Sequence, residues 1–160
     1  MGCLTVDSPI GPLTLSSRNG VLTGLSWGKQ ADNEPDRIVE TAAEQLAEYF
    51  AGARCGFDLP LETGGSGFQQ RVWEAMCAIP PGRTLTYGDV ARSLDSAPRA
   101  VGGACGKNPI VIVVPCHRIV GSAGLGGFAG RERRLDIKTW LLDHERRHWS
   151  DSELRLNATQ

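Results

Sequence analysis

Apolar and polar side chains alternate along residues 3–27, and the alternation is broken at Asn19-Gly20. Alternation with a period of two is the pattern of a strand that buries one face. The Asn-Gly pair stands between two such runs, residues 13–15 and 21–25, and it favours the tight turn of a β-hairpin. The pattern therefore predicts a small antiparallel sheet in the first part of the sequence.

The next stretch changes to helical spacing. Asp36 is a suitable cap for a helix over residues 37–50, because its carboxylate can accept from the open N–H groups of the first turn. The apolar residues that share one face of this helix are Ile38, Ala42, Leu46 and Phe50. Residues 57–61 predict another strand, and the glycine-rich residues 63–67 predict a linker. We therefore expect an N-terminal domain over residues 1–63.

Three helices are predicted after the linker, each from a residue at its start. Ser66 and Thr86 are N-cap residues, and Pro98 stands at the favoured first position of the third helix. A short helix, a tight turn and a helix of small residues are typical of a helix-turn-helix. Glycines cost the third helix up to ~1 kcal/mol each relative to alanine, which fits close approach of its backbone either to a ligand or to another helix. A last helix is predicted over residues 135–144.

These elements together predict an α+β fold class. A small N-terminal antiparallel sheet with one helix precedes a mostly helical domain, like a winged helix or helix-turn-helix, over residues 64–150. Residues 151–160 are polar and predict a loose tail. A chain of 160 residues is long enough for two small cores.

The segment after the third helix carries the most reactive side chains. Its β-branched run, residues 110–114, is long enough for a buried strand, and Pro115 would end that strand because proline cannot donate to a sheet. Cys116, His117 and Arg118 follow. A thiol at the end of a strand beside a base is the arrangement of an activated nucleophile, whereas the simpler interpretation is a small buried cysteine.

This Asn-Pro, apolar run and Pro-Cys-His-Arg box resembles the active-site signature of the O6-alkylguanine-DNA alkyltransferases, the methylated-DNA–protein-cysteine methyltransferases. Further segments fall in the family's order and spacing: residues 68–73, 80–90, 99–102 and 140–145. The resemblance is strong over residues 66–146 and weaker over residues 1–62. It implies a ribonuclease H-like N-terminal domain and a DNA-repair protein that transfers an alkyl group irreversibly from O6-alkylguanine to Cys116, once per molecule.

The resemblance also implies the roles of the catalytic residues. An unactivated alkyl group needs a thiolate, and a free thiol is only a few per cent ionised at neutral pH. His117 would take the proton of Cys116 directly or through a water, and Glu145 would hold the imidazole and stabilise its cation. Asn108 would hydrogen-bond near the active site and brace the turn between the recognition helix and the strand. Two other histidines are expected at the surface: His144 and His148.

DNA contacts are implied in the same way. A guanine O6 inside a duplex is out of reach of a buried thiol, so the nucleotide must be flipped out, at a cost of roughly a few kcal/mol. Arg99 would fill the vacated stack and Tyr87 would help rotate the nucleotide, the plainer alternatives being a phosphate contact and a core tyrosine. Small residues would let the third helix lie close in the minor groove. The expected DNA-contacting residues are Thr86, Tyr87, Arg99, Ala100, Gly102, Gly103 and Arg118.

A pocket for the alkylated base is implied around the cysteine. Its expected lining is Tyr87, Val114, Pro115, Ile119, Gly127, Phe128 and Ala129. The sequence departs from the family at residues 131–134, a charged run that is a few residues longer, and at Ala129, where many relatives have a serine. We predict no cofactor. A metal site is also not expected, because Cys3 and Cys55 have no histidine near them in sequence and none occurs before His117.

The composition also indicates a binding partner and a cellular compartment. The net charge is −1, but residues 1–65 hold 4 Lys/Arg and 9 Asp/Glu, whereas residues 66–150 hold 12 and 7. The basic second half is expected to bind a polyanion in a salt-sensitive way. The expected partner is double-stranded DNA that contains O6-alkylguanine, bound by a monomer, with clustering on DNA left open. Five cysteines without framework spacing, and no signal peptide or membrane-length apolar run, favour the reducing cytoplasm.

Two other functions fit parts of the pattern. A non-catalytic relative would bind alkylguanine in DNA without repairing it, but such relatives typically replace the nucleophile, and Cys116 is present. A cysteine hydrolase would use Cys116 and His117, but its base would then adjoin its nucleophile in sequence, and the helix-turn-helix would have no role. Alkyl transfer is the function that we predict.

Overall fold

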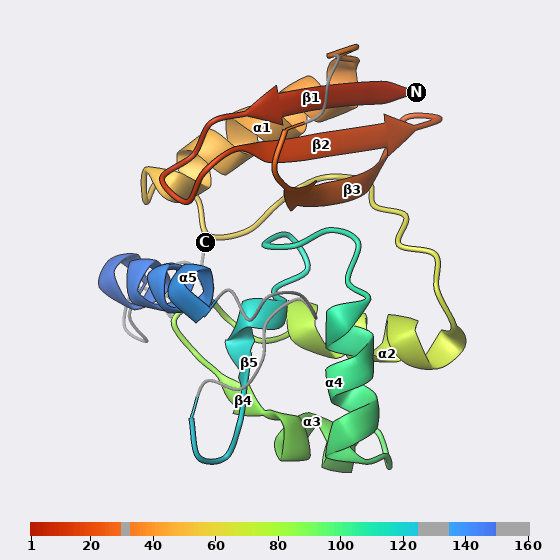
Figure 1. Cartoon of the computed structure of the whole chain (residues 1–160), viewed down its shortest axis with the longest axis vertical. Helices are drawn as coiled ribbons and strands as arrows, with labels where there is room; N and C mark the ends of the chain where they lie inside the picture. The colour runs from red at the N-terminus through yellow and green to blue at the C-terminus, as the bar shows by residue number, and fades with distance from the viewer. Residues whose placement is uncertain (30–32, 125–134, 150–160) are drawn as a thin grey trace. The chain divides into compact units, whose positions relative to one another are not determined.

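The computed structural model describes residues 1–29, 33–124 and 135–149, and these form two units (Figure 1). The first unit contains residues 1–64 together with 109–113, and the second contains residues 65–108 and the described residues from 114 onward. We expected two domains that are each continuous in sequence. The structure differs in one segment, because residues 109–113 belong to the first unit. In the described part of the chain, no helix is both long enough and apolar enough to cross a membrane.

The first unit contains a three-stranded antiparallel sheet. Its strands β1 (Gly2–Val6), β2 (Leu13–Arg18) and β3 (Val21–Trp27) lie in the order β1-β2-β3. Asn19 (φ 52°) and Gly20 (φ 79°) connect β2 to β3, and both have the positive φ that a type I′ hairpin turn requires. The predicted hairpin is confirmed.

Helix α1 (Arg37–Phe50) packs against this sheet (Figure 1). Asp36 caps it as predicted, because its carboxylate accepts from the Val39 N–H at 3.0 Å. The core between the two layers consists of Leu13, Leu15, Leu22, Leu25, Val39, Ala42, Leu46 and Tyr49. The strand predicted over residues 57–61 is wrong: only Leu61 pairs with the sheet, and the preceding proline has no N–H to extend the ladder.

The second unit is mostly helical. It contains helices α2 (Gly67–Cys77), α3 (Tyr87–Ser93), α4 (Pro98–Gly106) and α5 (Leu135–His148), the 3-10 turn η1 (Cys116–Arg118), and the short parallel strands β4 (Leu85–Thr86) and β5 (Ile119–Val120). Ser66 and Thr86 cap α2 and α3 through complete capping boxes. Helix α4 contacts both α2 and α3. The predicted helix starts and the α+β class are confirmed.

Residues 110–114 do not form the predicted strand. Leu25 on β3 donates to the Pro109 carbonyl at 3.0 Å and accepts from the Val111 N–H at 3.2 Å, and the pairing stops there. The chain then turns at Ile112, whose φ of 72° is unusual for a β-branched residue, and Val113 N–H donates back to Val111. An apolar run shows that a segment is buried, but not that it has a partner along its whole length.

Helix α5 is longer than predicted, ending at His148 instead of His144. His144 was expected at the surface but is buried, because the inner face of α5 continues through this last turn. Its ring stacks on Trp140 with centroids 4.8 Å apart and lies 4.4 Å from the ring of His148. The expectation for His144 is therefore wrong, whereas His148 is half-buried.

Candidate active site

The position of Cys116 is set by a tight turn immediately before it. Pro115 (φ −84°, ψ 70°) is the centre of an inverse γ-turn, in which the Cys116 N–H donates to the Val114 carbonyl at 2.9 Å. The Asn108 side chain donates to the same carbonyl at 2.7 Å. Asn108 thus helps to hold together the turn before Cys116, whereas the resemblance implies that it braces the earlier turn between the recognition helix and the strand. Cys116 itself is buried.

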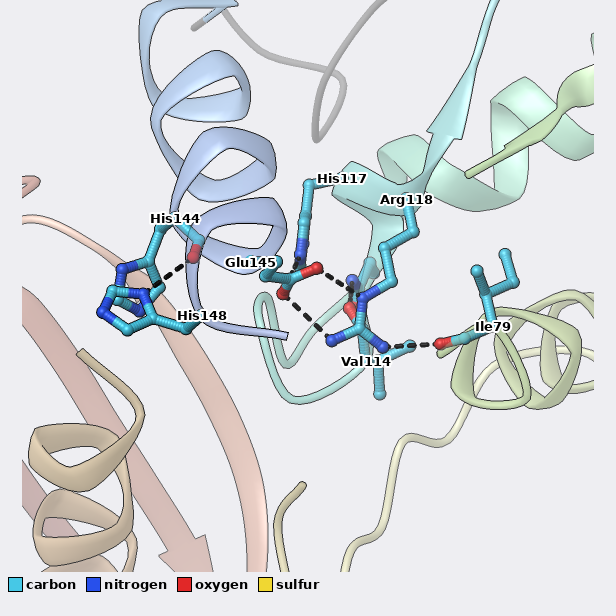
Figure 2. A network of polar contacts seen from close by, with 8 residues as sticks. Ile79, Val114, His117, Arg118, His144, Glu145 and His148 are labelled. Carbon is cyan, nitrogen blue, oxygen red and sulfur yellow. Dashed lines mark hydrogen bonds and ion pairs between the residues drawn. The ribbon is translucent and has the colours of Figure 1, made fainter. Parts of the chain in front are cut away.

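His117 and Glu145 form a fully buried pair (Figure 2). The His117 Nε2 atom lies 2.7 Å from the Glu145 Oε2 atom. A carboxylate only accepts hydrogen bonds, so this contact assigns the proton to Nε2 and leaves the lone pair on Nδ1. Nδ1 is buried and has no hydrogen-bond partner among the described residues. The ring is therefore oriented to accept a proton on its Nδ1 side.

Arg118 binds the same carboxylate from its other side. Its Nε donates to Glu145 Oε1 at 2.9 Å and its Nη2 to Oε2 at 3.0 Å, while Nη1 donates to the Ile79 carbonyl at 2.6 Å (Figure 2). The side chain is only 7% exposed. This placement differs from the expected DNA contact, because the three donating nitrogens point into the protein and not toward solvent.

Burial and charge set the protonation of this network. Burial disfavours ionisation of Glu145, but the charge and hydrogen bonds of His117 and Arg118 outweigh it and hold the pKa of Glu145 well below its ordinary value. Burial lowers the pKa of His117, against the opposing effect of Glu145. At neutral pH the resting site therefore contains an ionised Glu145 and a neutral His117, which is the state that a general base needs.

Lys138 is a functional candidate that the sequence interpretation missed. It is fully buried on α5, and its Nζ donates to the Ile119 carbonyl at 2.7 Å and lies 5.8 Å from the centre of the Tyr87 ring. Burial lowers its pKa to about 8, opposed by the thiols of Cys116 and Cys105. Its spacing in the sequence could have indicated it, because Lys138 precedes Glu145 by two helical turns and lies on the same face of the helix.

Cys105 is a second buried thiol that interacts electrostatically with Cys116 and Lys138. Burial, with a smaller effect of Cys116, raises the pKa of Cys105 to about 12. A thiol with such a pKa stays protonated at neutral pH and is a poor nucleophile. All five cysteines lie in the described part of the chain, and none of them forms a disulfide.

The residues expected to contact DNA lie on or beside the helix-turn-helix. Arg99, Ala100 and Gly103 are exposed on α4, and Gly102 is half-buried there. A Cβ placed on Gly102 would lie 4.0 Å from the Tyr87 ring, so this part of α4 passes close to Tyr87, the half-buried first residue of α3. Thr86 uses its hydroxyl as the N-cap of α3.

The expected pocket is described only in part. Val114, Pro115 and Ile119 are buried around the turn that carries Cys116. The other expected lining residues, Gly127, Phe128 and Ala129, and the departure at residues 131–134 lie outside the described residues.

The fold and the site together define a two-unit α+β protein with a helix-turn-helix and a buried cysteine followed by a histidine–glutamate pair. Residues 67–147 match the DNA-binding domain of 6-O-methylguanine DNA methyltransferase, and residues 1–63 match the ribonuclease-like domain of the same protein. The chain therefore belongs to the 6-O-methylguanine DNA methyltransferase family. It is a DNA-repair alkyltransferase, as the sequence predicted.

Individual relatives agree over nearly the whole chain. A methylated-DNA–protein-cysteine methyltransferase of Mycolicibacterium paratuberculosis is 50% identical over 155 residues, which cover 90% of this chain and 92% of that protein. The crystal structure of Mycobacterium tuberculosis O6-methylguanine methyltransferase is similar, with a TM-score of 0.82, 41% identity, and coverage of 97% of this chain and 98% of that one. A Mycobacterium tuberculosis OGT in complex with DNA has a TM-score of 0.80 at 44% identity, covering 90% and 92%.

Proposed function

We propose that this protein repairs O6-alkylguanine in duplex DNA by moving the alkyl group to Cys116. The observation that carries the assignment of residues is the fully buried His117–Glu145 pair, which begins at the residue after Cys116 and leaves Nδ1 as the basic nitrogen of the ring. The same pair argues against a purely structural role for the Cys-His segment. Two buried ionisable side chains that are held in one protonation state are typical of a functional site.

The reaction balances without a cofactor. The Cys116 thiol gives its proton to His117 Nδ1, directly or through a water, and the thiolate attacks the alkyl carbon. The bond between that carbon and guanine O6 breaks, the electron pair stays with the guanine, and the proton passes to the guanine ring. The products are S-alkylcysteine, a thioether, and an intact guanine. Nothing in this sequence of steps regenerates the thiol, so each molecule acts once.

Burial of Cys116 requires that the alkylated base leave the helical stack. We propose that α4 lies in the minor groove, where its exposed small residues allow close approach, that Arg99 takes the place of the flipped base, and that Tyr87 contacts the flipped nucleotide. Binding through the basic second half would depend strongly on salt. We further propose that the protein is a monomer and that it lies in the cytoplasm. The five cysteines without a disulfide support the cytoplasmic location.

A labelled substrate tests this proposal. A fixed amount of protein is incubated with increasing amounts of duplex DNA that contains tritiated O6-methylguanine, and the label on the protein is counted. We expect transfer to stop at one methyl per chain, and peptide mass analysis to find the mass of an added CH2 on the peptide that contains Cys116. Label that stays in tightly bound DNA would instead indicate a non-catalytic binding protein, and repeated turnover on an ester or amide would indicate a hydrolase.

Lys138→Met should slow methyl transfer most strongly below about pH 8. Lys138 is charged below its lowered pKa of about 8 and then favours a thiolate at Cys116. If the lysine charge stabilises the Cys116 thiolate by about 1.4 kcal/mol, its removal lowers the thiolate population about tenfold. We therefore expect a rate about tenfold lower at pH 7. As the pH rises through about 8 the wild-type lysine loses its charge, and the two rates should converge. Lys29→Met, at an exposed position, serves as the control.

Arg99→Ala should slow repair of duplex DNA by about tenfold or more, and repair of single-stranded DNA much less. The reason is that extrusion of a base costs least where no intact stack must be opened. Rates on matched single-stranded and duplex oligonucleotides measure the difference. Arg54→Ala, a half-buried arginine of the first unit, is the control. Equal losses on both substrates would show that Arg99 is only a phosphate contact.

A further inference from the structure

Arg118 has a place in this site that its position in the Pro-Cys-His-Arg box does not reveal. We propose that Arg118 is a positioning residue for alkyl transfer: it holds Glu145 in one orientation and balances its charge, so that His117 rests as a neutral base toward Cys116. This inference rests on the proposed function, because it assigns a role in the same reaction.

The geometry of the guanidinium supports a positioning role. Two of its nitrogens bind the two carboxylate oxygens of Glu145 side by side, and the third binds the Ile79 carbonyl just beyond the end of α2. Such a planar fork restricts both the position and the rotation of a carboxylate, which a single ammonium group cannot do. One side chain from η1 therefore links the carboxylate of α5 to the Ile79 carbonyl beyond α2 (Figure 2).

Orientation of Glu145 passes directly to the imidazole. Oε2 accepts both from Arg118 Nη2 at 3.0 Å and from His117 Nε2 at 2.7 Å. Because Arg118 prevents rotation of the carboxylate, Oε2 is held where it can accept the hydrogen bond from His117. The ring is held with its protonated nitrogen toward Glu145 and with Nδ1 on the opposite side.

The charge of Arg118 matters as much as its shape. A buried carboxylate that faces only an imidazole favours an imidazolium partner, and a histidine that is already protonated cannot accept the thiol proton. Arg118 supplies the positive charge that Glu145 needs before the reaction starts. The charged groups that act on His117 are Glu145, Arg118 and Lys138; burial lowers its pKa, Glu145 raises it, and the two cations add to the lowering.

The role also explains why this arginine is not a DNA contact. Its side chain is nearly as buried as that of His117, and Nε, Nη1 and Nη2 all donate within the protein. Swinging the guanidinium out to a phosphate would leave Glu145 charged in a buried site with His117 alone. Loss of one partner from a buried ion pair is strongly unfavourable.

Two substitutions separate shape from charge. Arg118→Lys keeps the positive charge without the fork, and Arg118→Gln removes the charge. Methyl-transfer rates are measured from roughly pH 5 to 9, the range in which histidine titrates, after circular dichroism has shown that each variant is folded. Arg54→Lys and Arg54→Gln, at a partly exposed ion pair in the first unit, are the matched controls.

We expect Arg118→Lys to lower the rate about tenfold at every pH, because orientation is lost while the charge remains. We expect Arg118→Gln to lower the rate most at low pH and to recover as the pH rises, because His117 becomes cationic over a wider range. In ¹⁵N-imidazole NMR at pH 7, the wild type should show a neutral ring protonated on Nε2, and Arg118→Gln a cationic ring.

Two outcomes would overturn the inference. One is a rate profile of Arg118→Lys that coincides with the wild type, which is decisive even where Arg118→Gln does not fold. The other is a wild-type ring that is already cationic at pH 7. Failure of the proposed function itself looks different, since the wild type would then take no methyl label from DNA at all.

Discussion

We expect Cys116→Ala to abolish methyl transfer from O6-methylguanine DNA while the protein remains folded. Among the described side chains of the site, the Cys116 thiol is the group that we propose takes the alkyl group, and the neighbouring Cys105 cannot replace it, because burial raises the pKa of Cys105 to about 12. Removal of one buried sulfur costs about 1 kcal/mol, which is small for a core position. Label counting on the protein and thermal unfolding measure the two effects.

Binding completes the test of Cys116. The alanine variant should still bind O6-methylguanine duplex DNA, since the helix-turn-helix that we propose for docking is unchanged. Cys77→Ala is the matched control, because this exposed cysteine lies at the end of α2 and should transfer label normally. Label on the Cys116→Ala protein, or a loss of transfer in Cys77→Ala, would show that the nucleophile has been misassigned.

The second large effect is expected at Glu145. Glu145→Gln should slow methyl transfer by about a hundredfold, because His117 loses the partner that orients it and stabilises its cation. The same change should destabilise the protein by about 3–5 kcal/mol, since the buried guanidinium of Arg118 loses its carboxylate. Rates are compared at a temperature where both proteins are folded, and stability is taken from denaturant unfolding.

The stability effect of Glu145 should depend on pH in one direction. The folded protein holds the pKa of Glu145 below its ordinary value of 4.5, so the carboxylate stabilises the fold fully above that value. This stabilisation is lost as the pH falls from 4.5 toward the lower folded value. The difference in unfolding free energy between wild type and Glu145→Gln should therefore shrink in acid. Asp143→Asn, an exposed change on the same helix, serves as the control.

Prediction from sequence was most successful where the determinants are local. The Asn19-Gly20 turn and the helix caps at Asp36, Ser66 and Thr86 depend on contacts within about four residues, and all four are found. It failed for residues 110–114, because the length of a strand depends on a partner elsewhere in the chain. The Leu25 backbone pairs with this segment only at one point.

The candidate site divides in the same way. A motif of adjacent residues identified Cys116 and His117, and the family's pattern pointed to Asn108 and Glu145. The inward position of Arg118 and the presence of Lys138 were not predicted. Both depend on contacts between distant segments. Arg118 contacts Glu145, 27 residues away, and Ile79, 39 residues away, and Lys138 contacts Ile119, 19 residues away.

The sequence by itself predicted the type of chemistry, since a thiol beside an imidazole in this box is typical of a nucleophile and its base, and it determined the helix starts and the hairpin turn. Only the tertiary structure decided which ions neutralise one another around that base. The reason is physical: a turn or a cap forms among neighbours in the chain, whereas the protonation of a buried group depends on every charge and dipole that folding brings near it.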